Sequence, residues 1–128
     1  MTEPRGELSL RNLAMPADTN PNGDIFGGWL LSQMDIAGGL SAKGRSHSRI
    51  ATVAIESMSF HQAVRVGEIV CCYTDILKVG RTSMRIRIEV WTMGMPYNQT
   101  RAKVTEGIFT YVAIDENGKA QPVDREEA

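Results

Sequence analysis

The sequence predicts an α+β fold in which one buried helix lies against an antiparallel sheet. Three observations lead to this prediction. An apolar segment at residues 25–43 follows a polar loop, four longer segments with strand character come after it, and short turns join several of those segments. The chain has 128 residues, which is the usual size of one domain, so we expect a single domain over residues 1–128.

The segment at residues 25–43 is apolar on nearly all sides, which is typical of a helix buried over most of its surface. Four glycines fall within it: Gly27, Gly28, Gly38 and Gly39. Each glycine costs about 1 kcal/mol relative to alanine inside a helix. We therefore expect the backbone to approach another group closely there. Gly44 is the predicted end of the helix.

The remaining segments read as strands, expected at residues 8–13, 50–60, 68–79, 81–91 and 103–114. In the segment 81–91, apolar Met84, Ile86, Ile88 and Val90 alternate with Arg85, Arg87, Glu89 and Trp91, which predicts one packed face and one solvent face. The segment 103–114 has apolar residues in both alternating sets and is expected to be central in the sheet. A single helix can cover only one face of the sheet, and an open sheet has unpaired edge strands. Pairing with a second copy would resolve both problems, so we expect at least a homodimer.

Composition excludes several classes of function. The formal charge is −1 and no basic block is present, which argues against a nucleic-acid partner. No apolar run reaches the roughly 18–20 residues of a membrane span, and residues 1–7 lack the pattern of a secretory signal. Cys71 and Cys72 are adjacent in a predicted strand and point to opposite faces, so we expect two buried thiols in a reducing, cytoplasmic compartment. His47 and His61 lack the spacing of metal ligands, and no metal is expected.

The candidate catalytic groups lie at and just after the junction between the polar loop and the helix. Gly27 and Gly28 lie where the polar loop becomes apolar, and Asp35 lies inside the apolar part. Backbone amides at the start of a helix can hold a developing negative charge, and a carboxylate among apolar residues requires a reason to be there. Together they predict acyl transfer to water, with Asp35 as general base or nucleophile and a glycine amide polarising the carbonyl. The alternatives are a solvent-facing Asp35 and glycines that serve packing only.

Residues 13–35, with the sequence LAMPADTNPNGDIFGGWLLSQMD, resemble the signature of the YciA-like acyl-CoA thioesterases, a hotdog-fold family. The similarity continues, in order, through residues 51–60, 66–73, 78–83 and 109–115. The resemblance implies a curved antiparallel sheet wrapped around one central helix. It also implies a homodimer with active sites at its interface, assembled further to a hexamer as a trimer of dimers. The substrate would be acyl-CoA, the products a free acid and CoA, and no cofactor would be needed.

The same resemblance assigns roles to individual residues. The acid of the family matches Asp35, the polar residue of the preceding loop matches Asn20, and the carbonyl-polarising amide matches Gly27 or Gly28, with Gly27 the first choice. In related enzymes the first two come from different subunits, so Asn20 and Asp35 are expected to meet across the interface. On composition alone, Asn20 also fits a simple turn residue.

Residues 78–83 form a predicted strand–strand turn that could contact the CoA part of the substrate. The residues proposed for this role are Lys78, Gly80, Arg81, Thr82 and Ser83. Arg81 offers a fork of donors for phosphate, and the two hydroxyls add hydrogen bonds. An ordinary surface hairpin is the alternative. We also place Glu56 and Ser57 beside the pantetheine channel.

Two rival functions remain open from the sequence. A hotdog hydratase or dehydratase would use a histidine, for which His61 is the candidate. A non-catalytic acyl-CoA sensor would bind without turnover, although Asp35 argues against it because a binder has little use for an acid beside the carbonyl.

Overall fold

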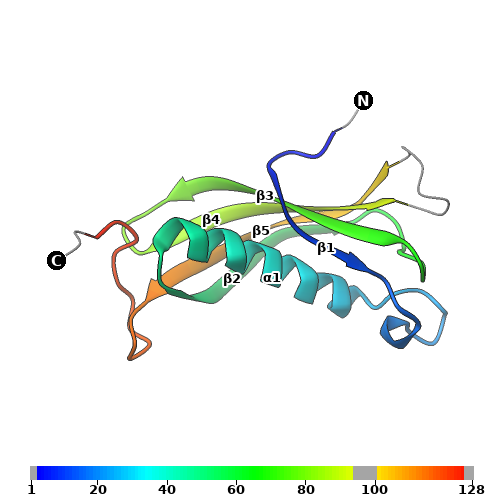
Figure 1. Cartoon of the computed structure of the whole chain (residues 1–128), viewed down its shortest axis with the longest axis horizontal. Helices are drawn as coiled ribbons and strands as arrows, with labels where there is room; N and C mark the ends of the chain where they lie inside the picture. The colour runs from blue at the N-terminus through cyan, green and yellow to red at the C-terminus, as the bar shows by residue number, and fades with distance from the viewer. Residues whose placement is uncertain (1–2, 94–100, 126–128) are drawn as a thin grey trace.

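Five antiparallel strands form one sheet, and a 20-residue helix lies along one of its faces (Figure 1). The structure is a computed structural model that describes residues 3–93 and 101–125. Its elements in chain order are β1 (Glu7–Leu13), the short 3-10 helix η1 (Pro16–Asp18), α1 (Gly27–Ser46), β2 (Arg49–Phe60), β3 (Ile69–Val79), β4 (Ser83–Met93) and β5 (Arg101–Ile114). The predicted α+β architecture is confirmed.

The strand order across the sheet is β1-β3-β4-β5-β2, with every neighbouring pair antiparallel. Each predicted strand is present, with ends that differ from the prediction by no more than two residues. β5 lies between β4 and β2, so it is an interior strand, although the middle position belongs to β4. The connecting turn predicted at residues 93–99 falls almost entirely outside the described residues.

The helix does not end at Gly44 as predicted, because α1 continues to Ser46. His47 then takes the left-handed conformation, with φ of 53°, and its N–H donates to the carbonyl of Lys43 at 2.8 Å. A left-handed residue after the last turn is a common way to end a helix, and glycine is favoured there but not required. Lys43 and Arg45 place positive charge in the last turn, where the helix dipole favours it.

The core lies between α1 and the inner face of the sheet. Its residues from α1 include Leu30, Met34 and Ala37, and those from the sheet include Met84, Ile86, Ile88, Val90, Phe109, Tyr111 and Ala113. The rings of Phe109 and Tyr111 stack with centroids 6.3 Å apart. This is the packed face predicted for β4, together with one of the two alternating sets of β5.

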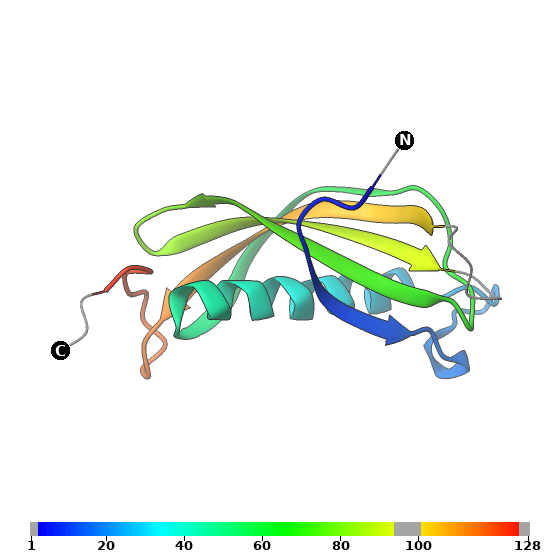
Figure 2. The same cartoon turned by 45° about the horizontal axis from the view of Figure 1, so that its top comes forward.

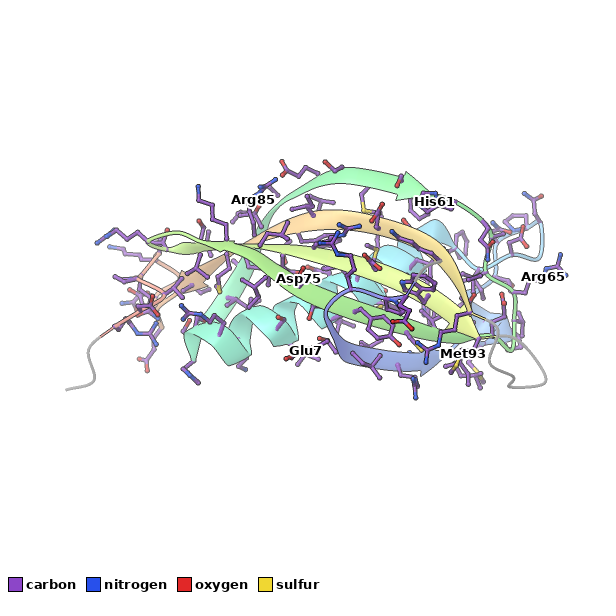
Figure 3. The ribbon with its side chains drawn as sticks, turned by 90° about the horizontal axis from the view of Figure 1, so that it is seen from above. Glu7, His61, Arg65, Asp75, Arg85 and Met93 are labelled. Carbon is purple, nitrogen blue, oxygen red and sulfur yellow. The ribbon has the colours of Figure 1, made fainter. Side chains whose placement is uncertain are left out.

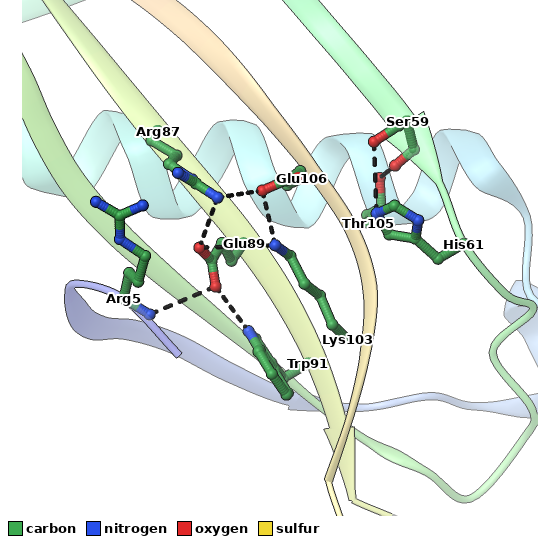
Figure 4. Close-up of polar contacts among 9 residues, drawn as sticks. All are labelled: Arg5, Ser59, His61, Arg87, Glu89, Trp91, Lys103, Thr105 and Glu106. Atoms are coloured by element: carbon green, nitrogen blue, oxygen red, sulfur yellow. Dashed lines mark hydrogen bonds and ion pairs between the residues drawn. The ribbon is translucent and has the colours of Figure 1, made fainter. Parts of the chain in front are cut away.

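The predicted solvent face of β4 is wrong at two positions, because Glu89 and Trp91 are only 1% and 3% exposed. The Trp91 indole donates to Glu89 Oε1 at 2.9 Å, and an Nη2 of Arg87 lies 3.1 Å from Glu89 Oε2 (Figure 4). Chain before β1 also reaches this face, where Arg5 N donates to Glu89 Oε1 at 3.4 Å. Alternation along one strand cannot reveal that other segments cover its outer face.

β2 forms one edge of the sheet, opposite β1, as the view onto the outer face shows (Figure 3). Three of its large apolar side chains are exposed: Val53 by 57%, Ile55 by 47% and Phe60 by 51%. An exposed apolar edge strand is a template for pairing with another chain. In the single chain, the β2 edge is therefore free to pair with a strand of another chain.

Both cysteines are buried and free, as predicted. Burial raises the pKa of the Cys72 thiol to about 12, so this thiol stays protonated near neutral pH. The sulfur of Cys71 accepts a hydrogen bond from Arg11 Nε at 3.2 Å. In the part of the chain that the structure describes, no helix is both long and apolar enough to cross a bilayer.

Candidate active site

Asp35 lies on α1, half-buried, on the side of the helix that faces β2 and β5. Its Oδ1 accepts two hydrogen bonds, from the Thr52 hydroxyl at 2.7 Å and from the Tyr111 hydroxyl at 3.1 Å. The Tyr111 hydroxyl is also 3.1 Å from the main-chain carbonyl of Asp35. Two strands thus fix one oxygen of this carboxylate, and among the described residues no partner is found for its Oδ2.

A groove of about 350 Å³ runs along α1 beside Asp35. Its lining residues are Asp35, Ile36, Gly39, Leu40, Lys43, Arg49, Ile50 and Thr52. Ile36, Leu40 and Ile50 give it an apolar lining, and the cations Lys43 and Arg49 belong to the end of α1 and the start of β2. Asp35 is thus half-buried and lines this groove, and its part in a reaction stays a prediction.

Gly27 and Gly28 are the first two residues of α1, and both are exposed. The preceding residue, Phe26, supplies no side-chain cap to the helix start. The first amides of a helix have no partner within the helix, so they are available to an acceptor. A Cβ added at Gly28 would meet nothing within 4 Å, and one at Gly27 would meet only the Phe60 ring at 4.0 Å. Packing within the chain therefore gives no reason for glycine at these positions.

Asp35 and Gly27 lie at separate points along α1. Eight residues of α-helix separate them, which corresponds to about 12 Å along the axis. A general base lies within about 3 Å of the water that it deprotonates, and an oxyanion donor lies within about 3 Å of the carbonyl oxygen. This separation along one helix favours a site to which the two residues come from different copies of the chain.

Asn20 organises the loop before α1. Its Oδ1 accepts hydrogen bonds from the backbone N–H of Asn22 at 2.9 Å and of Asp24 at 3.2 Å, and its own N–H donates to the Asp24 carbonyl at 2.7 Å. The turn role that composition allowed is therefore present. Within the described residues, no partner is found for Nδ2 of Asn20, which leaves that amide group available to a ligand.

The predicted turn at residues 78–83 joins β3 to β4, with Gly80 N–H donating to the Ser83 carbonyl at 2.8 Å. Lys78 and Arg81 are exposed. The carbonyls of Arg81 and Thr82 accept from Val123 and Ala113, which ties the turn to the chain after β5. Figures 1 and 2 agree that this turn lies at the end of the molecule where α1 ends, far from the start of that helix. The contact with CoA stays a prediction.

Three other candidates lie away from the groove. His61 is exposed after β2, with Nε2 3.5 Å from the Ser59 hydroxyl (Figure 4). Glu56 pairs with Arg85, and Ser57, with φ of 58°, lies at an irregularity in β2. Ser57 lines a separate hollow of about 220 Å³ with Leu77, Arg87, Glu106, Gly107 and Ile108. The placement of Glu56 and Ser57 beside the same channel as Asp35 is therefore not supported within one chain.

Sequence reasoning missed Thr52 and Tyr111, the two residues that hold Asp35. By its spacing Tyr111 shares one face of its strand with Phe109 and Ala113, but nothing in that spacing indicates which helix residue it meets. Register between distant strands decides this, and Thr52 lies directly opposite Tyr111 in the pairing of β2 with β5. Within residues 3–93 and 101–125, no cluster of three or more His, Cys, Asp or Glu side chains is arranged to hold a metal ion.

Comparison with known proteins places this chain in a family. The profile of the Thioesterase superfamily matches residues 22–96, which include the loop after Asn20, all of α1 and the β3–β4 turn. The chain belongs to the thioesterase superfamily. It is 55% identical over 123 residues to "Acyl-CoA thioester hydrolase YciA" of Salmonella typhimurium, covering 94% of this chain and 92% of that protein. The predicted resemblance to YciA-like proteins is confirmed.

The chain has the same fold as several solved thioesterase structures. A hexameric broad-specificity acyl-coenzyme A thioesterase superposes with a TM-score of 0.90 at 50% identity, covering 98% of this chain and 86% of that one. The hexameric thioesterase of Yersinia pestis gives a TM-score of 0.90 at 50% identity, covering 97% and 100%. A hexameric hotdog-fold thioesterase of Campylobacter jejuni gives 0.87 at 38% identity, covering 93% and 91%. The predicted hotdog fold is confirmed.

Proposed function

We propose that this protein hydrolyses the thioester of acyl-CoA to a free carboxylic acid and CoA. The observation that carries the proposal is the carboxylate of Asp35, held by two hydroxyls through Oδ1 in the wall of a groove. The names of its relatives, with about half of all residues identical over most of the chain, support the same substrate class.

In the proposed reaction, Asp35 takes a proton from a water molecule as that water attacks the thioester carbon. The carbonyl oxygen becomes negatively charged and is stabilised by the N–H of Gly27 or Gly28. The C–S bond then breaks, and CoA leaves as the thiol after its sulfur takes the proton that Asp35 removed from the water. Direct attack by Asp35 to give a mixed anhydride, which water then hydrolyses, is the other route that this geometry allows.

The site is proposed to combine residues of two subunits. The separation of about 12 Å between Asp35 and Gly27 along one helix supports this arrangement. Asp35 of one subunit would work with the partner subunit's Gly27 and Asn20. The free edge of β2, with its exposed Val53 and Ile55, is the proposed seam of the homodimer. Because three related structures are described as hexameric, further assembly to a trimer of dimers is proposed.

CoA phosphates are proposed to bind at cationic positions. The β3–β4 turn offers exposed Lys78 and Arg81 beside the hydroxyls of Thr82 and Ser83, with Gly80 shaping the turn. A Cβ at Gly80 would lie 2.9 Å from the Ser83 hydroxyl oxygen, so a side chain there would disturb that hydroxyl. Arg fits phosphate through its fork of donors, and Lys acts as a point charge.

The test is thiol release from a panel of acyl-CoA esters, comparing the parent with Asp35→Asn. We expect the parent to release thiol and Asp35→Asn to lose about 10²–10⁴-fold in kcat, the usual contribution of a positioned base. Near-parent turnover by Asp35→Asn would refute the role of the acid. Binding of acyl-CoA without turnover by the parent would favour a sensor. Hydration of an enoyl-CoA that is lost in His61→Ala would favour a hydratase.

A further inference from the structure

Tyr111 makes an unusual approach to the helix that carries Asp35. Its side chain is fully buried, yet its hydroxyl lies 3.1 Å from both the main-chain carbonyl and Oδ1 of Asp35. One phenol thus contacts the backbone and the carboxylate of the same residue. A donor placed in this way sets the position of the carboxylate relative to its own helix turn.

Gly38 makes this approach possible. A Cβ at residue 38 would lie 2.2 Å from the Tyr111 hydroxyl oxygen, 2.8 Å from its Cζ and 2.6 Å from Ile88 Cδ1. No side chain fits there unless the phenol moves. A glycine inside a helix costs about 1 kcal/mol relative to alanine, and contact between the phenol and the helix explains why that cost is tolerated. The expectation of a close approach at this glycine is thereby confirmed.

We infer that Tyr111, admitted by Gly38, is a positioning residue for the proposed hydrolysis, and that it directs the free oxygen of Asp35 into the groove. Oδ1 carries the hydrogen bonds from Tyr111 and Thr52. The reacting oxygen is then Oδ2, whose lone pairs remain available to the water or to the thioester. This inference rests on the proposed function, because it assigns a role to Asp35 in the reaction.

The phenol stays protonated at working pH, so its hydroxyl can donate a hydrogen bond to the carboxylate. Burial, with a smaller contribution from the charge of Asp35, raises the pKa of Tyr111 well above that of an ordinary tyrosine. A donor to a carboxylate favours its charged form. A change in this donor should therefore be visible in the pH profile of thiol release. The charged groups that line the same groove are Lys43 on α1 and Arg49 on β2, and both are present in every variant described below.

The experiment measures kcat, KM and the pH profile of thiol release for Tyr111→Phe. The matched control is Tyr73→Phe, which removes a phenol hydroxyl that contacts Arg101 rather than the groove. We expect kcat of Tyr111→Phe to fall by up to about 100-fold, as a small misplacement of a catalytic group can do. KM should stay close to the parent value, and the acidic limb of the profile should move to higher pH. Tyr73→Phe should match the parent in all three measurements.

A second variant keeps the packing of Tyr111 and should shift the acidic limb of the pH profile in the opposite direction. The chain has three tyrosines, so 3-fluorotyrosine incorporated into Tyr73→Phe/Tyr97→Phe labels Tyr111 alone. Fluorine makes the phenol a stronger donor, and the acidic limb should then move to lower pH. This keeps the inference testable if Tyr111→Phe does not fold. An acidic limb that the fluorinated tyrosine leaves in place, or a Tyr111→Phe enzyme with parent kcat and pH profile, would overturn the inference.

Failure of this inference is distinguishable from failure of the proposed function. A parent enzyme without thiol release from any acyl-CoA contradicts the proposed function itself. A parent that turns over and an Asp35→Asn variant that does not, together with an unaffected Tyr111→Phe, contradict only the role of Tyr111.

Discussion

Gly38 and Tyr111 are in contact so close that a methyl group on the glycine would overlap the phenol, with 2.2 Å between that Cβ and the hydroxyl oxygen. Gly44 lies in the same helix, but a Cβ there would meet nothing within 4 Å. The two positions share a backbone conformation and differ in their surroundings. They therefore separate the effect of helix propensity from the effect of packing.

We expect Gly38→Ala to destabilise the fold by about 1–3 kcal/mol, because the phenol and Ile88 must shift to make room. Gly44→Ala should stabilise it by about 0.5–1 kcal/mol, because alanine loses less backbone entropy in a helix. Thermal or chemical denaturation of both variants measures this difference. Equal changes in the two variants would contradict the packing role of Gly38.

At the start of α1, stability and activity should move in opposite directions. A Cβ at Gly28 meets no atom of its own chain, so Gly28→Ala should leave the melting temperature at or above that of the parent. The same methyl group would obstruct the approach of a thioester to the helix amides, and loss of an oxyanion donor reduces kcat by about 10²–10³-fold. A Gly28→Ala enzyme with parent kcat would argue that this amide is not used.

The β2 edge offers a test of assembly. Ile55→Lys places a charge on an exposed apolar position of the edge strand, and edge charges oppose pairing with another chain. Light scattering after size-exclusion chromatography should show smaller species, with loss of thiol release. Leu77→Lys is the control, because Leu77 is similarly exposed but lies on β3, away from the β2 edge. Intact assembly in Ile55→Lys would place the seam elsewhere.

The charge network on the outer face predicts a pH dependence of stability. A hydrogen bond from Lys103, at 2.8 Å, is the largest cause that holds the pKa of Glu106 below its ordinary value, and Arg87 adds to it (Figure 4). A carboxylate with a lowered folded pKa stabilises the fold above the unfolded value of 4.5 and loses this contribution as pH falls through the folded pKa.

We therefore expect Glu106→Gln to lower the free energy of unfolding at pH 7 by up to about 1 kcal/mol, the usual range for partly exposed ion pairs. Below pH 4.5 the difference between the variant and the parent should shrink. Urea denaturation at several pH values measures it, with the exposed Glu116→Gln as control. A difference that stays constant down to pH 2 would show that the Glu106 charge is not involved.

Much of the fold could be predicted because periodicity is a local property. The alternation of Met84, Ile86 and Ile88 correctly identified the core face of β4. The same pattern failed at Glu89, because its burial depends on chain before β1 and on residues of β5. Helix ends were less accurate, since His47 ends α1 in a conformation usually associated with glycine.

The candidate site was predicted only in part. Asp35 and the glycines were identified because their chemistry conflicts with an apolar helix, and a conflict of this kind is visible in the sequence itself. Thr52 and Tyr111 follow from the register of β2 against β5 and from the way the sheet curves over α1, and neither is a local property. The turn between β3 and β4 was predicted correctly from the sequence. Its contact with CoA is not a property of the chain alone, so it stays a prediction.

The length of helix between Gly27 and Asp35 also sets how defects combine in an assembly. If each reaction centre takes its acid from one copy and its amides and Asn20 from the other, Asn20→Ala and Asp35→Ala subunits mixed together restore one centre per pair. A chain that bears both changes would silence both centres of any pair it joins, including the one built on its intact companion's acid. Co-expressed with the parent, such a chain would act as a dominant inhibitor.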